Sequence, residues 1–218
     1  IELRILAHLS GDENLKSAFL NDLDIHSYTA SILFSKDKDS ITEEERAIAK
    51  TVNFGIIYGM SAYGLSKQLD IPYERAESFI NEYFLRYPKV KIYIQKVYEE
   101  AQEKGYVTTL FKRRRELPEI KSSNPQLKEL AKRQAINTPI QGLAADLIKI
   151  AMIKIYNEFK NRNLNTKFLL QIHDELIFDV PKEELDIVID IVKENMQNAL
   201  KLDVPIKVNI KYAKTWVN

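Results

Sequence analysis

Two short apolar runs with a mostly polar centre between them stand out late in the sequence. Residues 168–170 and 176–178 are apolar, and residues 171–175 read Gln-Ile-His-Asp-Glu. Apolar β-formers on both sides of a short polar break are typical of a hairpin. We therefore predict a hairpin of well-buried strands over residues 168–180.

The polar centre of this hairpin carries His173, Asp174 and Glu175. Adjacent carboxylates at the end of buried strands repel each other and lose water, so a cation that joins them keeps both ionised. Mg²⁺ takes such oxygen ligands and usually leaves room for substrate phosphates. The alternative is a solvated turn, where Asp and Glu are common, and this stretch by itself favours the turn.

A capping box predicts a helix over residues 42–58. Thr42 is followed three residues later by Glu45, the pattern in which each side chain bonds the backbone amide of the other residue. Gly59 comes next, and glycine commonly ends a helix.

Arg46, Lys50, Phe54 and Tyr58 recur every four residues along this helix. Residues at this spacing form one slanting stripe, about 18 Å long at 1.5 Å per residue. Arg and Lys are rarely buried, so the stripe suits a ligand with phosphates at one end and a ring at the other. A surface helix with a partly buried aromatic end is an equal alternative.

Prolines and glycines mark the boundaries of the other long helices. With a break at Pro139, these helices are expected over residues 72–87, 88–104, 125–138, 140–159 and 182–200. The alternation of Ile206, Val208 and Ile210 predicts a last strand over residues 205–211. The fold class is therefore α+β, a helical block followed by an antiparallel sheet backed by helices.

Composition limits the classes of protein further. The chain has 218 residues, of which 45% are hydrophobic and 29% charged, as in ordinary soluble domains. It has no cysteine, which excludes disulfides and thiolate metal sites. No apolar run reaches membrane-spanning length, and no signal-peptide pattern is present. The net charge is +1, so a nucleic-acid partner does not follow from the total charge. The dense basic run at residues 112–115 is more informative, with a solvated loop as its alternative.

Four segments in the same order resemble one family, the family A DNA polymerases of the bacterial DNA polymerase I type. Residues 46–59, RAIAKTVNFGIIYG, resemble the fingers motif, and residues 171–175, QIHDE, resemble the second palm carboxylate motif. Residues 1–4, IELR, look like the tail of the first palm motif, and residues 133–142, RQAINTPIQG, match as well. The resemblance covers essentially the whole chain. Lys112 departs from it, because the family commonly has Gly there.

The resemblance implies a role for each residue of these motifs. Those implied to act in catalysis are Asp174 and Glu175, as metal-binding carboxylates, and Lys50, as a cation that could protonate pyrophosphate. Those implied to form the dNTP site are Arg46, Lys50 and His26 at the triphosphate and Phe54 beside the incoming sugar and base. Tyr58 is implied to occupy the template-base position and to swing away when the fingers close, and Glu2, packed with Tyr58, to be the steric gate against a ribose 2′-OH. Those implied to touch the primer-template duplex are Arg133, Asn137, Gln141 and His173.

The resemblance also implies the wider setting. Residues 1–11 and 125–218 would belong to the palm, and residues 12–124 to the fingers. The activity implied is template-dependent addition of dNTPs to a primer 3′-OH in DNA replication and repair, with two Mg²⁺ ions. The partners implied are primer-template DNA and dNTP, for a monomeric cytoplasmic bacterial enzyme that is associated with the nucleoid and not with a membrane.

One metal-binding Asp of the family would lie just before Ile1, and the thumb would lie earlier still. We therefore expect this chain to be a fragment that does not polymerise in isolation. Two alternatives remain: a relative of the single-subunit RNA polymerases, which share the Lys…Tyr-Gly pattern, and a non-catalytic DNA-binding remnant. Glu2 and Phe54 argue against the first, and the presence of Arg46, Lys50 and Asp174 argues against the second.

Overall fold

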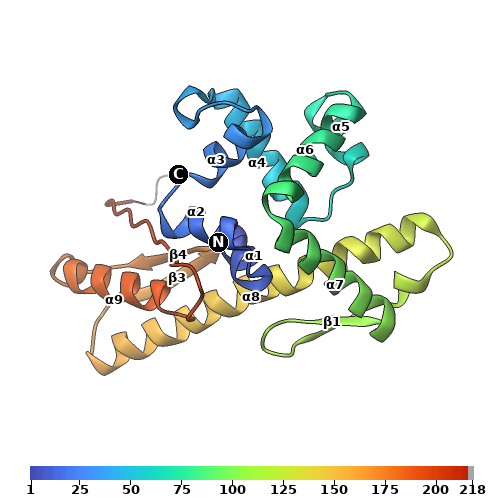
Figure 1. The fold of residues 1–218 in the computed structure, drawn as a ribbon. Helices are drawn as coiled ribbons and strands as arrows, with labels where there is room; N and C mark the ends of the chain where they lie inside the picture. The colour runs from blue at the N-terminus through green and yellow to red at the C-terminus, as the bar shows by residue number, and fades with distance from the viewer. Residues whose placement is uncertain (216–218) are drawn as a thin grey trace. The chain divides into compact units, whose positions relative to one another are not determined.

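A computed structural model describes residues 1–215 of the chain (Figure 1). Its elements in chain order are α1 (Glu2–Ser10), α2 (Glu13–Leu20), α3 (Ile25–Leu33), η1 (Lys38–Ser40), α4 (Glu43–Ile57), α5 (Ala62–Leu69), α6 (Tyr73–Arg86), α7 (Pro88–Lys104), β1 (Tyr106–Thr108), β2 (Arg114–Glu116), η2 (Pro118–Lys121), α8 (Pro125–Asn161), β3 (Lys167–Ile172), β4 (Glu175–Asp179), η3 (Lys182–Glu184) and α9 (Leu185–Gln197). Within the described residues, no helix is long and apolar enough to cross a bilayer.

The chain forms two compact units, Glu2–Leu143 and Ala144–Asn218 together with Ile1. Within residues 1–215 the strands form two antiparallel two-stranded sheets, β1–β2 in the first unit and β3–β4 in the second. This confirms the predicted α+β class. The unit boundary falls inside α8, and the predicted division into palm and fingers at residues 11 and 124 stays a prediction. Residues 216–218, the end of the predicted second palm segment, lie outside the described residues.

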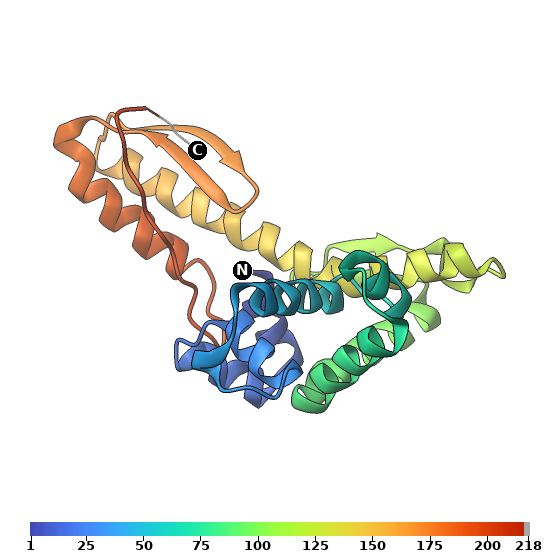
Figure 2. The ribbon, with the colours of Figure 1, turned by 90° about the horizontal axis from the view of Figure 1, so that it is seen from above.

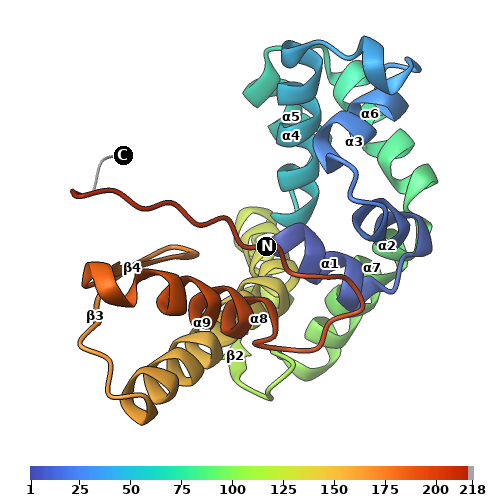
Figure 3. The ribbon, with the colours of Figure 1, turned by 90° about the vertical axis from the view of Figure 1, so that its left-hand side faces the viewer.

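Helix α4 begins and ends where its sequence signals predict. The Thr42 hydroxyl accepts from the Glu45 amide, and the Glu45 carboxylate accepts from the Thr42 amide, which completes the capping box. Gly59 has φ +64°, and the amides of Gly59 and Met60 bond the carbonyls of Ile56 and Gly55. This is the paired arrangement that closes a helix on a left-handed glycine. Helix α3 packs against α4 (Figure 3).

Helix α8 continues through Pro139, so the predicted break there is wrong. A proline removes one helical N–H and crowds the preceding turn, but here the neighbouring groups hold the helix. The Thr138 hydroxyl donates to the Gln134 carbonyl at 2.6 Å. Ala135 and Ile140, on either side of the proline, are fully buried. Tertiary packing therefore outweighs the local cost of the proline.

The β3–β4 hairpin of the second unit lies alongside the later part of α8 and α9 (Figure 2). Its inner side chains meet Phe159 of α8, and the rings of Phe168 and Phe178 lie 4.4 Å apart between centroids. Val188 and Val192 of α9 complete this core. The apolar runs on which the hairpin was predicted therefore contribute one face to a helix-backed core.

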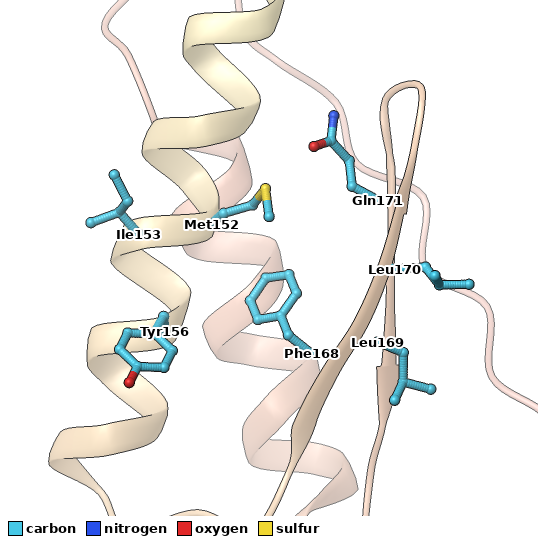
Figure 4. A pocket seen from close by; sticks show the side chains of 7 residues that line it. All are labelled: Met152, Ile153, Tyr156, Phe168, Leu169, Leu170 and Gln171. Atoms are coloured by element: carbon cyan, nitrogen blue, oxygen red, sulfur yellow. The ribbon is translucent and has the colours of Figure 1, made fainter.

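The prediction that the hairpin strands are well buried is wrong for this chain, because only one face is covered. Leu169 and Leu170 are 54% and 49% exposed. The strand register shifts between Phe168 and Leu170, a bulge that changes the direction of successive side chains. Figure 4 shows Phe168 turned toward α8 and the two leucines turned away from it. An apolar hollow of about 390 Å³ lies here, lined by Met152, Ile153, Tyr156, Phe168, Leu169, Leu170 and Gln171.

The strand predicted over residues 205–211 does not form. Ile206 and Val208 instead pack on Leu147 and Ala151 of α8. Their alternation therefore reflects an extended segment that covers a helix, a pattern that a strand and a covering segment share.

Candidate functional site

The four-residue stripe predicted from the sequence lies on the outer side of α4. Lys50 and Tyr58 are exposed, while Arg46 and Phe54 are half-buried. The opposite side of α4 carries buried residues, among them Ala49, Val52, Asn53 and Ile56. The core therefore fixes the rotation of the helix, and the two cations and two rings are left available to a ligand.

Asp24, which precedes α3, holds the first cation of the stripe. Its Oδ2 accepts from Nε and Nη2 of Arg46 at 3.0 and 2.7 Å. Its Oδ1 accepts from the amides of His26 and Ser27, which caps α3. Burial acts to raise the pKa of Asp24, but the Ser27 amide and Arg46 outweigh it and lower that pKa. One ionised carboxylate thus orients Arg46 relative to the start of α3.

Three rings form a row beside the cations. The centroids of His26 and Phe54 are 5.9 Å apart, and those of Phe54 and Tyr58 are 6.2 Å apart with nearly parallel planes, 20° between them. A hollow of about 260 Å³ opens here, lined by Lys50, Thr51, Phe54, Gly55, Tyr58, Met60 and Gln68. A cation at one end and flat rings along the wall suit a nucleotide-sized anion.

Glu2 on α1 meets the far end of the stripe. The Tyr58 hydroxyl donates to Oε2 of Glu2 at 2.9 Å. Burial, and then the bond to Glu2, raise the pKa of Tyr58 to about 12. The phenol therefore stays protonated at neutral pH and acts as the donor of this bond.

Gly59 brings the end of α4 directly against α8. A Cβ at this position would lie 3.1 Å from Cδ1 of Ile136 and 3.2 Å from Cγ of Arg133. Close approach as well as positive φ requires glycine here. As a result, the aromatic end of the stripe lies next to Arg133.

Arg133, Asn137 and Gln141 recur every four residues along α8 and so share one of its faces. Arg133 and Gln141 are exposed, and Asn137 is half-buried. Oδ1 of Asn137 is buried and has no hydrogen-bond partner among the described residues. Amide and guanidinium groups suit the DNA minor groove, whose acceptors are nearly the same for every base pair.

The basic run at residues 112–115 lies in the β1–β2 hairpin and supports α8. Nη2 of Arg113 donates to the Gly142 carbonyl at 3.1 Å, and Nη1 of Arg115 donates to Thr138 Oγ1 at 3.4 Å. The guanidinium of Arg114 lies 3.6 Å from the centroid of the Tyr106 ring. Lys112 has φ +64°, a conformation that glycine adopts more easily. This run, which the sequence only linked to an anionic partner, contacts the part of α8 around Pro139.

The acidic pair lies at the turn of the β3–β4 hairpin in the second unit. His173, Asp174 and Glu175 are exposed, and His173 has φ +53°. Gln171 Nε2 donates to the His173 carbonyl at 3.1 Å, which ties the turn to its strand. The desolvation assumed in the sequence argument is therefore not present in this chain. Among the residues that the structure describes, no three His, Asp or Glu side chains gather into a metal-binding group.

The structure thus divides the predicted site residues between the two units. The first unit brings together Glu2, His26, Arg46, Lys50, Phe54, Tyr58 and Arg133, with Asn137 and Gln141 further along α8. The second unit holds His173, Asp174 and Glu175.

Comparison with known proteins identifies the family. The model of "DNA polymerase family A" matches residues 1–218 of the chain. The chain belongs to DNA polymerase family A. Curated members similar to it include DNA polymerase I of Caldicellulosiruptor bescii, 52% identical over 99% of this chain and 25% of the relative, and that of Bacillus subtilis, 51% identical over 99% and 24%. The thermostable DNA polymerase I of Thermus aquaticus is 45% identical over 100% of this chain and 26% of the relative.

A solved family A structure has the same fold. It is the POL domain of Pol1 from M. smegmatis in complex with DNA primer-template and dNTP, 45% identical to this chain, with a TM-score of 0.95. The match covers 99% of this chain and 38% of that one. This family A chain spans about a quarter of the length of the curated relatives that it matches.

Asp24, Thr29 and Asn53 support the site of this family A chain but were not predicted from the sequence. Asp24 orients Arg46, and Thr29 bonds Asn53, which in turn contacts His26. The sequence did contain a sign of Asn53's role, because this side chain lies with Val52 and Ile56 on the core side of the helix. A buried amide requires hydrogen-bond partners. Asp24 offered only its position before a helix, which is common for a capping residue.

Proposed function

We propose that this chain is the nucleotide-binding and primer-end-binding part of a DNA-directed DNA polymerase. The observation that carries the proposal is the first unit of this family A chain. There, Lys50, Phe54 and Tyr58 line one hollow. Glu2 bonds Tyr58, His26 lies beside Phe54, and α4 ends against Arg133 of α8. A bound triphosphate would meet cations, and its base would meet flat rings.

The reaction proposed is attack of the primer 3′-OH on the α-phosphate of a dNTP. A new P–O bond forms to the primer oxygen, the bond to pyrophosphate breaks, and the 3′-OH proton is released. Arg46 and Lys50 would stabilise negative charge on the leaving pyrophosphate, and positioning would supply much of the remaining acceleration. Lys50 could also give pyrophosphate a proton; Lys50→Arg with an unchanged single-turnover rate and pH profile would rule that out.

Asp174 and Glu175 are the groups that would hold the Mg²⁺ ions. Both are carboxylates at an exposed turn, and hard oxygen ligands of this kind fit Mg²⁺. When bound, two such ions would stabilise the attacking and leaving oxygens of the displacement. The pair supplies only part of the ligands that two such ions take, because no third His, Asp or Glu joins it among the described residues. We expect no template-dependent dNTP incorporation by the isolated 218-residue chain, and its detection would contradict this assignment.

The partners proposed are primer-template DNA and a dNTP. The M. smegmatis POL domain, which matches nearly the whole chain, is described in complex with both. Arg133, Asn137, Gln141 and His173 would contact the duplex near the primer end. We further propose a monomeric, cytoplasmic enzyme of the bacterial nucleoid that acts in replication and repair.

Primer extension by the complete protein tests this function. We expect Asp174→Asn to lower single-turnover dNTP incorporation about a hundredfold or more, with primer-template affinity retained. Asp179→Asn, at the far end of β4, is the matched control and should keep the wild-type rate. Primer-template binding without any nucleotide transfer would favour the DNA-binding remnant, and incorporation of rNTPs in preference to dNTPs would favour the RNA polymerase relative.

A further inference from the structure

Three side chains of α3 and α4 form a hydrogen-bonded series that ends on His26. The Thr29 hydroxyl donates to Oδ1 of Asn53 at 3.2 Å. Nδ2 of Asn53 lies 3.1 Å from Nδ1 of His26. Asn53 is 0% and Thr29 1% exposed, so water cannot readily replace either partner. Buried polar groups of this kind keep their bonding partners, because loss of a partner costs free energy.

The direction of each bond decides which nitrogen of His26 carries the proton. In the structure Oδ1 of Asn53 accepts from the Thr29 hydroxyl, and the NH₂ group of Asn53 faces His26. An amide NH₂ can only donate, so Nδ1 of His26 must present its lone pair. In a neutral imidazole the proton then lies on Nε2.

The surroundings favour the neutral ring. Burial lowers the pKa of His26; Asp24 acts to raise it, and Arg46 and Lys50 lower it further. A neutral imidazole with its proton on Nε2 is a hydrogen-bond donor of fixed identity. It lies beside Phe54, in the part of the first unit where the cations of α4 begin.

We propose that Asn53, oriented by Thr29, is a positioning residue that holds His26 in the Nε2–H form, so that this nitrogen donates to a phosphate oxygen of the nucleotide. The assignment of the proton stands on the geometry alone. The phosphate contact rests on the proposed function. The two parts are tested by different measurements, so that failure of one is distinguishable from failure of the other.

Imidazole ¹⁵N spectra of the 218-residue chain at pH 8 test the position of the proton. The chain has three histidines, and loss of one signal set in His26→Gln assigns the ring. We expect His26 to show a protonated Nε2 and an unprotonated Nδ1. In Asn53→Asp the carboxylate can only accept, so the proton should move to Nδ1. A wild-type spectrum with the proton on Nδ1, or an equal mixture, would overturn the proposal.

Two further variants separate positioning from general damage. Thr29→Val removes the hydroxyl that orients the amide and should give a mixture of both proton positions at His26, even if Asn53→Asp does not fold. Asn195→Asp makes the same substitution on α9, where Asn195 bonds a carbonyl of its own helix, and should leave the His26 signals unchanged. An unaltered Nε2–H form in Thr29→Val would show that Thr29 does not orient the amide.

Titration with inorganic tripolyphosphate tests the phosphate contact. The Nε2 signal of His26 should shift in the wild-type chain, and the affinity for tripolyphosphate should fall about tenfold to a hundredfold in Asn53→Asp, the range for a hydrogen bond to a charged group. The same substitution in a His26→Gln background should cost clearly less. An unshifted Nε2 signal at saturation would overturn the contact and leave the proton assignment standing.

Discussion

The Tyr58 hydroxyl donates a 2.9 Å hydrogen bond to Oε2 of Glu2 and so joins the end of α4 to the first turn of α1. The bond fixes the Glu2 carboxylate beside the aromatic end of the proposed nucleotide site. A carboxylate held in this way both fills space and repels further acceptors, so an added hydroxyl on a sugar nearby would meet an occupied position.

Loss of the Glu2 side chain should weaken discrimination against ribonucleotides. In the complete polymerase, we expect Glu2→Ala to raise the ratio of rNTP to dNTP kcat/KM about tenfold or more. A tenfold change in this ratio corresponds to a free-energy difference of only about 1.4 kcal/mol. Tyr58→Phe keeps the ring and removes only the hydrogen bond, so its effect should be smaller. An unchanged ratio in Glu2→Ala would remove Glu2 from the sugar site.

Gly59→Ala should lower the free energy of unfolding by more than the cost of placing alanine in a left-handed conformation. A non-glycine residue in this conformation costs about 1–2 kcal/mol, and here the new Cβ would also crowd Ile136 and Arg133. Gly11→Ala is a matched control, with φ +62° and nothing within 4 Å of its Cβ. Urea unfolding of both variants should show the larger loss for Gly59→Ala, and equal losses would contradict the close approach.

Gly142→Ala should disturb the contact between α8 and the β1–β2 hairpin. Its Cβ would lie 2.3 Å from Cγ2 of Thr109, and overpacking of this kind typically costs about 1–3 kcal/mol. Thr109→Ser removes that methyl and keeps the hydroxyl that accepts from the Arg113 amide. The double variant should therefore regain stability in a double-mutant cycle. Purely additive losses would mean that Thr109 is not the obstacle.

The ionised Glu184 carboxylate should stabilise the second unit at neutral pH, and this stabilisation should be lost at acidic pH. The Asn165 amide and the Thr166 hydroxyl lower its pKa, while burial acts against them. Because the folded pKa lies below the unfolded one, this stabilisation is present above the unfolded value, about 4.3, and is lost as pH falls through the folded value.

Thermal unfolding of Glu184→Gln checks this pH dependence. The variant should unfold at a lower temperature than wild type at pH 7, and the difference should shrink as pH falls below about 4. Glu183→Gln, at the exposed neighbouring position, should have little effect at either pH. A difference that is constant with pH would contradict the role of the charge.

Local signals predicted much of the fold, because they act over a few residues. The Thr42–Glu45 box and Gly59 set the ends of α4, and Pro88 and Gly105 set those of α7. The helix break predicted at Pro139 was wrong because the effect of a proline on a helix depends on the packing around it, here around α8. The 205–211 segment misled it because alternation is the same whether a segment pairs in a sheet or covers a helix.

For the candidate site, the stripe on α4 was predictable because helical geometry alone brings residues at spacing four together. The supporting residues Asp24, Thr29 and Asn53 were not, because their partners lie more than twenty positions away in the sequence. The burial assumed for the acidic pair could not be judged either. Covering of the hairpin depends on packing, and one face of it is open here.

Helix α4 fixes the distance between the cations and the rings of the stripe. Its backbone runs without interruption from Glu43 to Ile57, so the separation of its cations from its rings is set by the helical rise and not by flexible chain. One residue inserted or deleted between Lys50 and Phe54 would turn the rings by about 100° relative to the cations. This stretch can therefore accept some changes of side chain, but it cannot accept a change of length.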